Sequence, residues 1–443
     1  MDPGARSATP VRLSGRALLC RVFLPFAMGH FLSSLMRSVN AMLAPQLVAA
    51  LALDSGQLGL LSSAFFFSFA LAQLPVGIAL DRYGPRKVQM VMLTLAALGA
   101  LAFAGGQDFV QLVCARLVIG LGLGGCFMSA LKAISTSIAP ARLPSVHGYL
   151  IAVGGLGAAS ATLPLRLALH YTDWRGLFMA LAAATLATGV LIYLLAPGPA
   201  PDGADGADGA DGADGAARAP FTWQALLDIY RNRAFRETVS LVLIPHTVFF
   251  GIQGLWIGRW LSDVAHFSEA AVAYLLYLGM AAIIFGAIAV GMLSEWAGRR
   301  GLAPIRLAAL GIALFIAVQL GFVCNYAPSY QVLAVLFTLI GAVTGIEYAI
   351  VAQSMPPALS GRAATCLNLL IFLGAFAVQA GFGQILGCWR PSLLQQYPAS
   401  AYRFAFGALV ALQLPGLAIY LWRQRASRLR SGKMDLPSGS PAP

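Results

Sequence analysis

Three charged side chains lie well inside long apolar stretches of this 443-residue sequence. They are Arg37 in "HFLSSLMRSVNAML", Arg116 in "RLVIGLG" and Glu347 in "TGIEYAIV". A guanidinium binds a carboxylate or phosphate through two parallel hydrogen bonds. Removing a carboxyl from water favours its neutral form, as a proton carrier requires. Because a charge at bilayer depth costs at least about 2.5–3.5 kcal/mol, each of these groups should face water or a partner.

The composition is that of a membrane protein, with 59% hydrophobic and only 10% charged residues. Soluble domains carry about 25% charged residues. The net charge of +12 does not indicate nucleic-acid binding, because the basic residues alternate with apolar runs instead of forming one face. The six cysteines show no zinc or disulfide spacing. We also find no P-loop and no nucleophile–base arrangement, so we expect no metal, cofactor, ATP-driven step or enzyme activity.

Apolar runs of about spanning length predict an all-α polytopic membrane protein with twelve transmembrane helices. The central connection contains "DGADGADGADGADGA", which predicts a flexible linker. We therefore expect a six-helix half at 1–196, a cytoplasmic linker at 197–237, a second six-helix half at 238–422 and a basic tail at 423–443. The twelve predicted spans are 22–44, 58–80, 88–106, 110–134, 146–168, 176–196, 238–261, 271–293, 304–324, 331–353, 363–387 and 403–422.

The basic residues predict the orientation of the chain. Most of the 29 lysines and arginines fall in the termini and loops of one side, including the loops after the second and eighth spans. Loops rich in lysine and arginine stay in the cytoplasm. We therefore expect both termini to be cytoplasmic, in a bacterial inner membrane.

Two loops repeat a pattern of glycine, acid and base. After the second span stands "GIALDRYGPRK", and after the eighth stands "GMLSEWAGRR". A shared acid, turn glycine and base at corresponding places indicates two related halves. The matched pairs, each 214 residues apart, are Gly77 with Gly291, Asp81 with Glu295, Gly84 with Gly298, and Arg86 with Arg300.

The first loop fits the motif G-x-x-x-D-R-x-G-x-R-[KR] of the major facilitator superfamily at every defined position. The matching residues are Gly77, Asp81, Arg82, Gly84, Arg86 and Lys87. With "RLVIGLG" in the fourth span, the chain resembles these secondary transporters over nearly its whole length. The resemblance implies two pseudo-symmetric six-helix bundles that rock about a central site. It also implies that Asp81 docks near the start of the eleventh span and latches the cytoplasmic side; the alternative is that the motif only sets topology and packing.

The resemblance further implies that spans 1, 4, 7 and 10 surround the central cavity. On a helical wheel of the first span, the polar residues fall within an arc of about 120°. We therefore predict that Arg37 contacts substrate or an ion, and the alternative is a structural hydrogen bond to helix backbone. The polar stripe consists of His30, Ser33, Ser34, Arg37 and Asn40.

Arg116 lies at about the same depth as Arg37, roughly 10 Å from the outer side at 1.5 Å per residue. Two guanidiniums at one level repel unless an anion lies between them, and a bound anionic substrate would supply that charge. The alternative is a packing or gating role for Arg116.

Glu347 is the predicted proton carrier, with His30 as a lesser candidate. The alternative for Glu347 is an ion pair with a basic residue near the cytoplasmic face. His246 lies 216 residues after His30, near the repeat offset, and shares one face of the seventh span with Gln253 and Trp256. The predicted substrate-binding residues are Arg37, His30, Ser34, Asn40, Arg116, Gln253, Trp256 and Asn368.

Taken together, these patterns predict a proton-linked, monomeric secondary transporter of a small organic anion, most plausibly a carboxylate. The fifth span lacks the glycine-proline-glycine-glycine pattern of many drug antiporters, and the second and eighth spans lack the arginines of nitrate porters. Two alternatives stay open: an exporter of drugs or siderophore-like amphipathic compounds, and a non-transporting membrane sensor. The expected partners are the anionic solute, a proton and the lipid bilayer.

Overall fold

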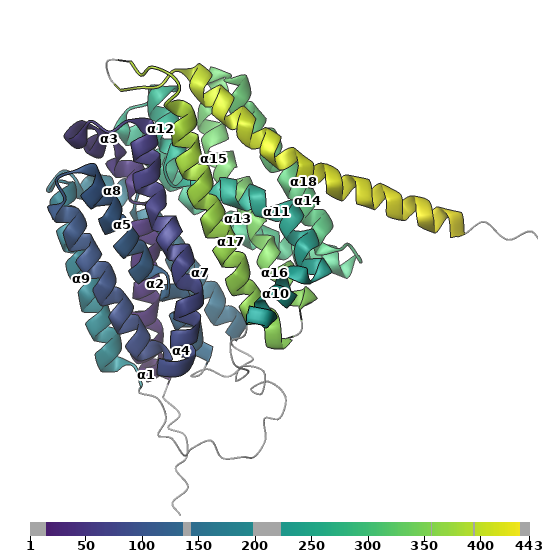
Figure 1. Ribbon diagram of the computed structural model, residues 1–443, viewed down its shortest axis with the longest axis horizontal. Coiled ribbons are helices and arrows are strands. Elements are labelled where there is room, and N and C mark those ends of the chain that lie inside the picture. The colour runs from purple at the N-terminus through teal and green to yellow at the C-terminus, as the bar shows by residue number, and fades with distance from the viewer. Residues whose placement is uncertain (1–14, 136–142, 198–222, 356, 393–394, 435–443) are drawn as a thin grey trace, which may run out of the picture.

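The computed structural model describes residues 15–135, 143–197, 223–355, 357–392 and 395–434. These residues form helices and no strand. The Asp-Gly-Ala repeat of the predicted linker lies outside them. Figure 1 shows two bundles side by side, coloured purple to blue and teal to yellow. We call the described residues up to 197 the N-terminal half and those from 223 onward the C-terminal half.

The N-terminal half consists of ten elements. They are α1 (Gly15–Leu18), the π-helix η1 (Leu19–Phe23), α2 (Leu24–Ser38), α3 (Asn40–Leu51), α4 (Ser55–Gly105), α5 (Phe109–Leu123), α6 (Cys126–Ser135), α7 (Leu143–Ser160), α8 (Leu163–Ala168) and α9 (Trp174–Leu195).

The C-terminal half begins with a short amphipathic helix. Its elements are α10 (Trp223–Arg231), α11 (Arg233–Gln253), α12 (Trp256–Asp263), α13 (Glu269–Arg299), α14 (Pro304–Cys324), the 3₁₀ turn η3 (Ala327–Ser329), α15 (Tyr330–Gly341), the 3₁₀ turn η4 (Ala342–Gly345), α16 (Ile346–Ser354), α17 (Pro357–Leu386) and α18 (Ala399–Met434).

The twelve-helix fold class is confirmed. In the described residues, ten helices are long and apolar enough to cross a membrane, and shorter apolar helices accompany them. One of the ten, α4, covers both the 58–80 and the 88–106 spans. The chain turns between them at Gly84, whose φ of 74° is a left-handed conformation that favours glycine.

Each of the four spans expected around the cavity is interrupted. The breaks lie at Val39 between α2 and α3, at Gly124–Gly125 between α5 and α6, at Gly254–Leu255 between α11 and α12, and at η4 between α15 and α16. Span 146–168 is also broken, between α7 and α8. A break frees backbone groups that lipid cannot satisfy, so it is tolerated where it faces protein or a water-filled cavity. Arg37 and Glu347 both lie within two residues of such a break.

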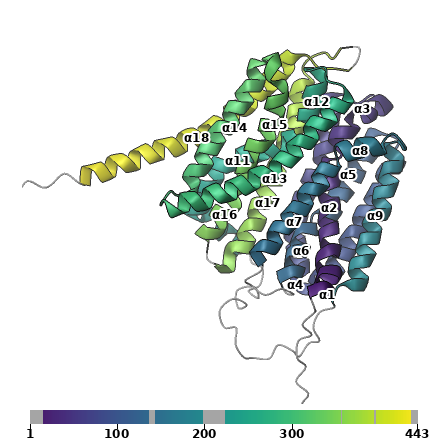
Figure 2. The same cartoon turned by 180° about the vertical axis from the view of Figure 1, so that it is seen from behind.

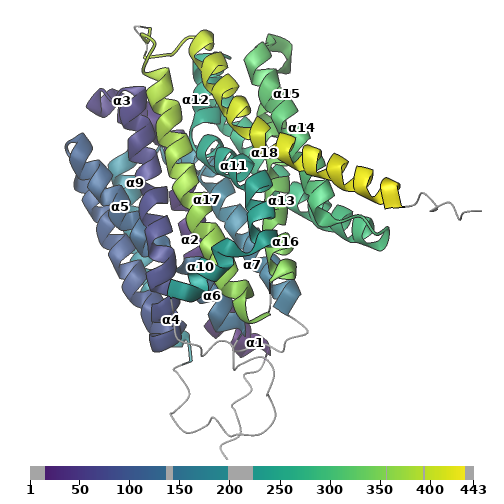
Figure 3. The ribbon, with the colours of Figure 1, turned by 45° about the vertical axis from the view of Figure 1, so that its right-hand side comes forward.

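Two helix pairs form the most extensive contacts between the halves among the described residues. Helix α4 packs on α17, as Figure 3 shows, and α7 packs on α13, as Figure 2 shows. The first pair is aromatic in its middle, where the ring centroid of Phe372 lies 4.5 Å from Phe69 and 6.0 Å from Phe66. In the second pair, Ala158 and other small residues of α7 pack against Met280.

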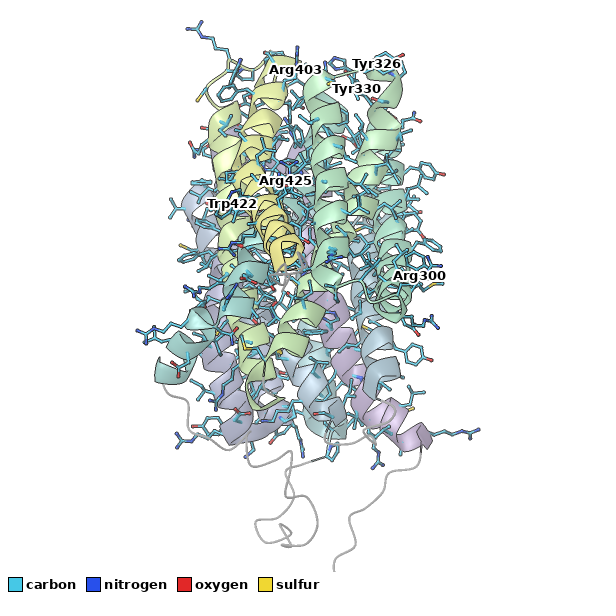
Figure 4. All side chains as sticks on the ribbon, turned by 90° about the vertical axis from the view of Figure 1, so that its right-hand side faces the viewer. Arg300, Tyr326, Tyr330, Arg403, Trp422 and Arg425 are labelled. Atoms are coloured by element: carbon cyan, nitrogen blue, oxygen red, sulfur yellow. The ribbon has the colours of Figure 1, made fainter. Side chains whose placement is uncertain are left out.

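The helices run between two ends of the molecule. We call the end that contains Asp81 the motif end, and the end where α4 begins the Ser55 end. Figure 4 shows Arg403, Tyr326 and Tyr330 together at the Ser55 end of the C-terminal half, with Arg300 lower down. Arg403 is tied there by a hydrogen bond from its Nε to the carbonyl of Val323, 2.8 Å away.

Candidate functional site

Arg37 lies at the interface between the halves, near the end of α2. Its guanidinium carbon is 5.3 Å from the ring centroid of Phe250, which α11 of the other half presents. A cation over an aromatic face is attracted by the ring, but the ring leaves the N–H donors available. Among the described residues, no carboxylate lies within ion-pair distance of this half-buried arginine. Within the part of the chain that the structure describes, Arg37 is therefore a cation without an anionic partner at the interface of the halves.

Glu347 is hydrogen-bonded to His246, which is four residues before Phe250. The bond joins His246 Nδ1 to Glu347 Oε1, and both side chains are buried, at 4% and 0% exposure. The other carboxyl oxygen of Glu347 has no hydrogen-bond partner among the described residues. The His246 ring stacks on Phe250, with centroids 5.0 Å apart and planes at 15°. A carboxyl and an imidazole in hydrogen-bond contact hold one proton between them.

Tyr348 completes this group. Its hydroxyl is hydrogen-bonded to Asn368 Oδ1 on α17, and its ring stands edge-on to His246 at 6.1 Å. We call Arg37, Phe250, His246, Glu347, Tyr348 and Asn368 the central cluster. Phe250 and Tyr348 are not among the residues predicted from the sequence. The only signals for them are that Phe250 follows His246 by one helical turn and that Tyr348 is next to Glu347.

The other predicted residues of the first span lie within the N-terminal half. The His30 ring is 5.1 Å from that of Phe127 on α6, and it packs so closely on Gly154 of α7 that a Cβ there would come within 2.3 Å of its Nε2. Asn40 donates to Ser62 Oγ over 2.9 Å, and Ser34 is buried. The structure therefore brings Arg37, but not His30, onto Phe250, whose ring stacks on that of His246.

Arg116 is enclosed by aromatic rings. Its guanidinium carbon lies 4.8 Å from the ring centroid of Phe103 and 5.2 Å from that of Phe178, and Nη1 donates to the carbonyl of Met36 over 3.0 Å. The side chain is only 1% exposed. Arg116 is thus level with Arg37, but this geometry favours the packing alternative over a shared anion between the two arginines.

Gln253 and Trp256 lie further toward the Ser55 end. Gln253 Nε2 is 3.5 Å from Met280 Sδ, and Trp256 Nε1 donates to the carbonyl of Gln379 over 3.0 Å. The Trp256 ring also fits between two glycines of different halves: a Cβ on Gly59 would come within 3.1 Å of the ring and one on Gly383 within 3.0 Å. Trp256 therefore belongs to the contact between the halves at this end.

Hydrogen bonds close the Ser55 end. Ser55 Oγ donates to the carbonyl of Gly383 over 2.9 Å, and Ser55 N–H donates to the Tyr397 hydroxyl over 3.2 Å. Tyr397 is held in turn by Asp263, whose Oδ2 accepts from the Tyr397 N–H at 3.3 Å and from the Tyr402 hydroxyl at 2.8 Å. Burial raises the pKa of the Asp263 carboxyl, and the Arg259 guanidinium beside it opposes that shift.

At the motif end, Asp81 forms an ion pair with Lys132 of α6, inside its own half. The side chains of the first residues of α17, where the expected latch would form, lie outside the described residues, so the latch stays a prediction. Arg86 likewise stays within its half, where Nε donates to the carbonyl of Tyr193 over 2.7 Å. In the C-terminal half, Glu295 pairs with Arg299 and Arg300 stacks on Trp296. Each of these four contacts, among the residues that the structure describes, lies within one half.

Comparison with known proteins places this geometry in a family context. The model of the Major Facilitator Superfamily matches residues 26–379. A curated relative named probable sulfoacetate transporter SauU, from Cupriavidus necator, is 27% identical over 157 residues, which span 35% of this chain and 36% of the relative. The probable L-galactonate transporter of Escherichia coli is 25% identical and is matched over 58% of this chain and 57% of its own. The cis,cis-muconate transport protein of Acinetobacter baylyi is 24% identical, over 70% of this chain and 74% of its own.

The solved structures show the same fold at low sequence identity. A bacterial homolog to the human lysosomal transporter Spinster, in an inward-facing and unoccupied conformation, superposes with a TM-score of 0.75 at 16% identity, covering 93% of this chain and 98% of that one. A variant of the nucleoside transporter NupG gives a TM-score of 0.67 at 12% identity, covering 90% and 98%.

Proposed function

The chain belongs to the major facilitator superfamily and is a multi-pass membrane transporter; we propose that its solute is a small organic anion, moved together with protons by alternating access. In this cycle, the central cluster binds the anion and the proton. We also propose that the motif end faces the cytoplasm of a bacterial inner membrane, as the distribution of basic residues predicts.

The observation that carries the proposal is the state of Arg37. This cation lies at the interface of the halves, over Phe250, and has no anionic partner among the described residues. A desolvated charge is expensive unless it is paired. A carboxylate or sulfonate can supply the missing charge and accept two hydrogen bonds from the planar guanidinium.

The names of several relatives support an acid as the solute. Sulfoacetate, L-galactonate and cis,cis-muconate each carry at least one carboxylate, and another relative is named hexuronate transporter. The chain covers 36% of the sulfoacetate transporter, so the names of the relatives add to the evidence from Arg37 and do not replace it.

The His246–Glu347 pair supports proton coupling. When His246 and Glu347 share one proton, the pair is neutral, and the charge of Arg37 gives the central cluster a net charge of one positive unit. A bound monovalent anion cancels this net charge. A further proton on the pair makes the net charge positive again. Because a low-dielectric site resists a change in net charge, binding of an anion and of a proton should favour each other. Glu347 carries the proton in this scheme and His246 shares it.

The closed Ser55 end sets the direction of access in this conformation. Ser55, Gly383 and Tyr397 join the halves there, so the central cluster would exchange solute through the motif end. Opening of the Ser55 end, with closure of the motif end, would expose the site to the other side.

Uptake into proteoliposomes tests the proposal, with sulfoacetate, L-galactonate and cis,cis-muconate as radiolabelled solutes and an imposed proton gradient. Loss of charge-assisted hydrogen bonds worth about 1.5–3 kcal/mol should weaken the apparent affinity of Arg37→Gln roughly ten- to hundredfold. Arg306→Gln, which changes an exposed arginine, is the matched control. If Arg37→Gln keeps the wild-type KM for every anion, or if only neutral or cationic amphipathic compounds move, the anion assignment is wrong.

A further inference from the structure

A cavity lies at the Ser55 end, away from the central cluster. Its walls come from α3 and α8 of the N-terminal half and from the first turn of α13 in the C-terminal half. Its volume is about 120 Å³, several times the roughly 10–15 Å³ that one water needs. Four polar side chains line it, Gln46, Arg166, His170 and Glu269, beside the apolar Met42 and Leu169. We call it the vestibule.

Two buried polar atoms of the vestibule have no hydrogen-bond partner in the described part of the chain. They are the donor Arg166 Nε and the acceptor Gln46 Oε1. Such groups cost about 1–3 kcal/mol each when left unsatisfied. Among the described residues Arg166 has no ion pair, although the Glu269 carboxylate lines the same space. The pattern is a guanidinium with no ion pair among the described residues, next to an amide oxygen that lacks a donor.

We propose that the vestibule binds a small hydroxycarboxylate. The ligand's carboxylate would accept from Arg166, and its hydroxyl groups would donate to Gln46 Oε1 and to the Glu269 carboxylate. A plain anion satisfies only Arg166 and is repelled by Glu269, whereas the hydroxyls of a neutral polyol can hydrogen-bond to these groups but leave the Arg166 charge uncompensated. A molecule that carries both groups on a short carbon chain satisfies the whole set.

A ligand can enter the vestibule from the Ser55 end, because the side chains at its rim are exposed. The central cluster is closed to ligand from this end. His170 and Glu269 are exposed at its rim, and Arg166 is half-buried in its wall. The site rests on the proposed function only in that its ligand is taken to be the transported solute. Because its walls belong to different halves, a bound ligand would hold them in the present arrangement, and the affinity would fall when the Ser55 end opens.

The test is equilibrium binding to the purified full chain in detergent, with L-galactonate, sulfoacetate and galactitol as probes. L-galactonate has the carboxylate and the hydroxyls, sulfoacetate lacks hydroxyls, and galactitol lacks the carboxylate. We expect two L-galactonate sites per chain in the wild type and one each in Arg37→Gln and Arg166→Gln. The double variant should bind none, and Arg306→Gln should match the wild type. Thermal unfolding of each variant checks that it is folded.

In the Arg37→Gln background, binding to the vestibule is measured without the contribution of the central cluster. There, L-galactonate should bind at least about tenfold more tightly than either other probe, and Gln46→Leu should weaken L-galactonate about tenfold while leaving sulfoacetate unchanged. Binding that survives Arg166→Gln in this background, no binding at all in it, or equal affinity for the three probes would each overturn the vestibule. Arg166-dependent binding in a chain that transports no anion would overturn the proposed function and leave the vestibule standing.

Discussion

The hydroxyl of Ser55, at the first turn of α4, donates to the backbone carbonyl of Gly383 on α17, 2.9 Å away. This bond joins the two halves at the end where the molecule is closed. The helices come so close here that a Cβ on Gly383 would lie 2.4 Å from the Ser55 carbonyl oxygen and 3.0 Å from the Trp256 ring. Closure of this end therefore depends on glycine as much as on the hydrogen bond.

Gly383→Ala should hold the Ser55 end open, because the added methyl group meets rigid backbone. Spin labels on Ala50 of α3 and Ala270 of α13, both exposed, report the separation of the halves by double electron–electron resonance in a background without native cysteines. We expect the distance distribution to shift to longer values. Gly291→Ala is the control, because a Cβ there meets nothing within 4 Å. An unchanged distance distribution in Gly383→Ala would mean that the contact between α4 and α17 accommodates the methyl group while the Ser55 end stays closed.

Arg37 and Arg116 should respond in opposite ways to replacement by lysine. Lysine cannot reproduce the contacts of Arg116 with Phe103, Phe178 and the Met36 carbonyl, so Arg116→Lys should lower stability by about 2 kcal/mol and leave the solute KM within about twofold. Arg37→Lys should raise KM with little effect on stability. Denaturation and uptake measured on the same preparations distinguish the two effects. If Arg116→Lys raises KM as much as Arg37→Lys does, Arg116 belongs to the binding site.

Glu347→Gln should uncouple solute movement from protons. The amide keeps the shape of the carboxyl beside His246 but cannot take up or release the proton. We expect gradient-driven uptake to fall at least about tenfold and to lose its pH dependence, while exchange of labelled for unlabelled solute continues. Glu295→Gln, at an exposed position, controls for charge. If Glu347→Gln still accumulates solute against its gradient when a proton gradient is imposed, the proton site lies elsewhere.

Exchanging the charges of Asp81 and Lys132 tests whether Asp81 acts through its ion pair within the N-terminal half. Asp81→Lys alone places two cations together, whereas Asp81→Lys with Lys132→Asp restores an ion pair within α4 and α6. Because both side chains are partly exposed, the pair contributes at most about 1 kcal/mol. We expect the double variant to recover most of the transport lost by the single one. No recovery would indicate that Asp81 works through α17 in another conformation, as the family resemblance implies.

Properties encoded in local runs of residues could be predicted from the sequence. Hydropathy locates the spans because every spanning backbone must be helical in lipid, and the G-x-x-x-D-R-x-G-x-R-[KR] loop identifies the family because its glycines and charges are contiguous. The wheel of the first span likewise identified Arg37 as a residue of the polar stripe, since periodicity alone determines which side chains share a face.

Which groups become partners was decided only by the tertiary structure. Glu347 and His246 are 101 residues apart in the chain, and neither periodicity nor charge indicates that α11 and α16 pack with these two side chains in contact. Arg116 and Arg37 are equally deep and equally charged, yet two phenylalanines enclose one while the other faces a different half. The vestibule around Arg166 exists only because α3, α8 and α13 converge. Depth and polarity follow from each segment by itself, whereas burial, pairing and cavities depend on how segments distant in sequence pack.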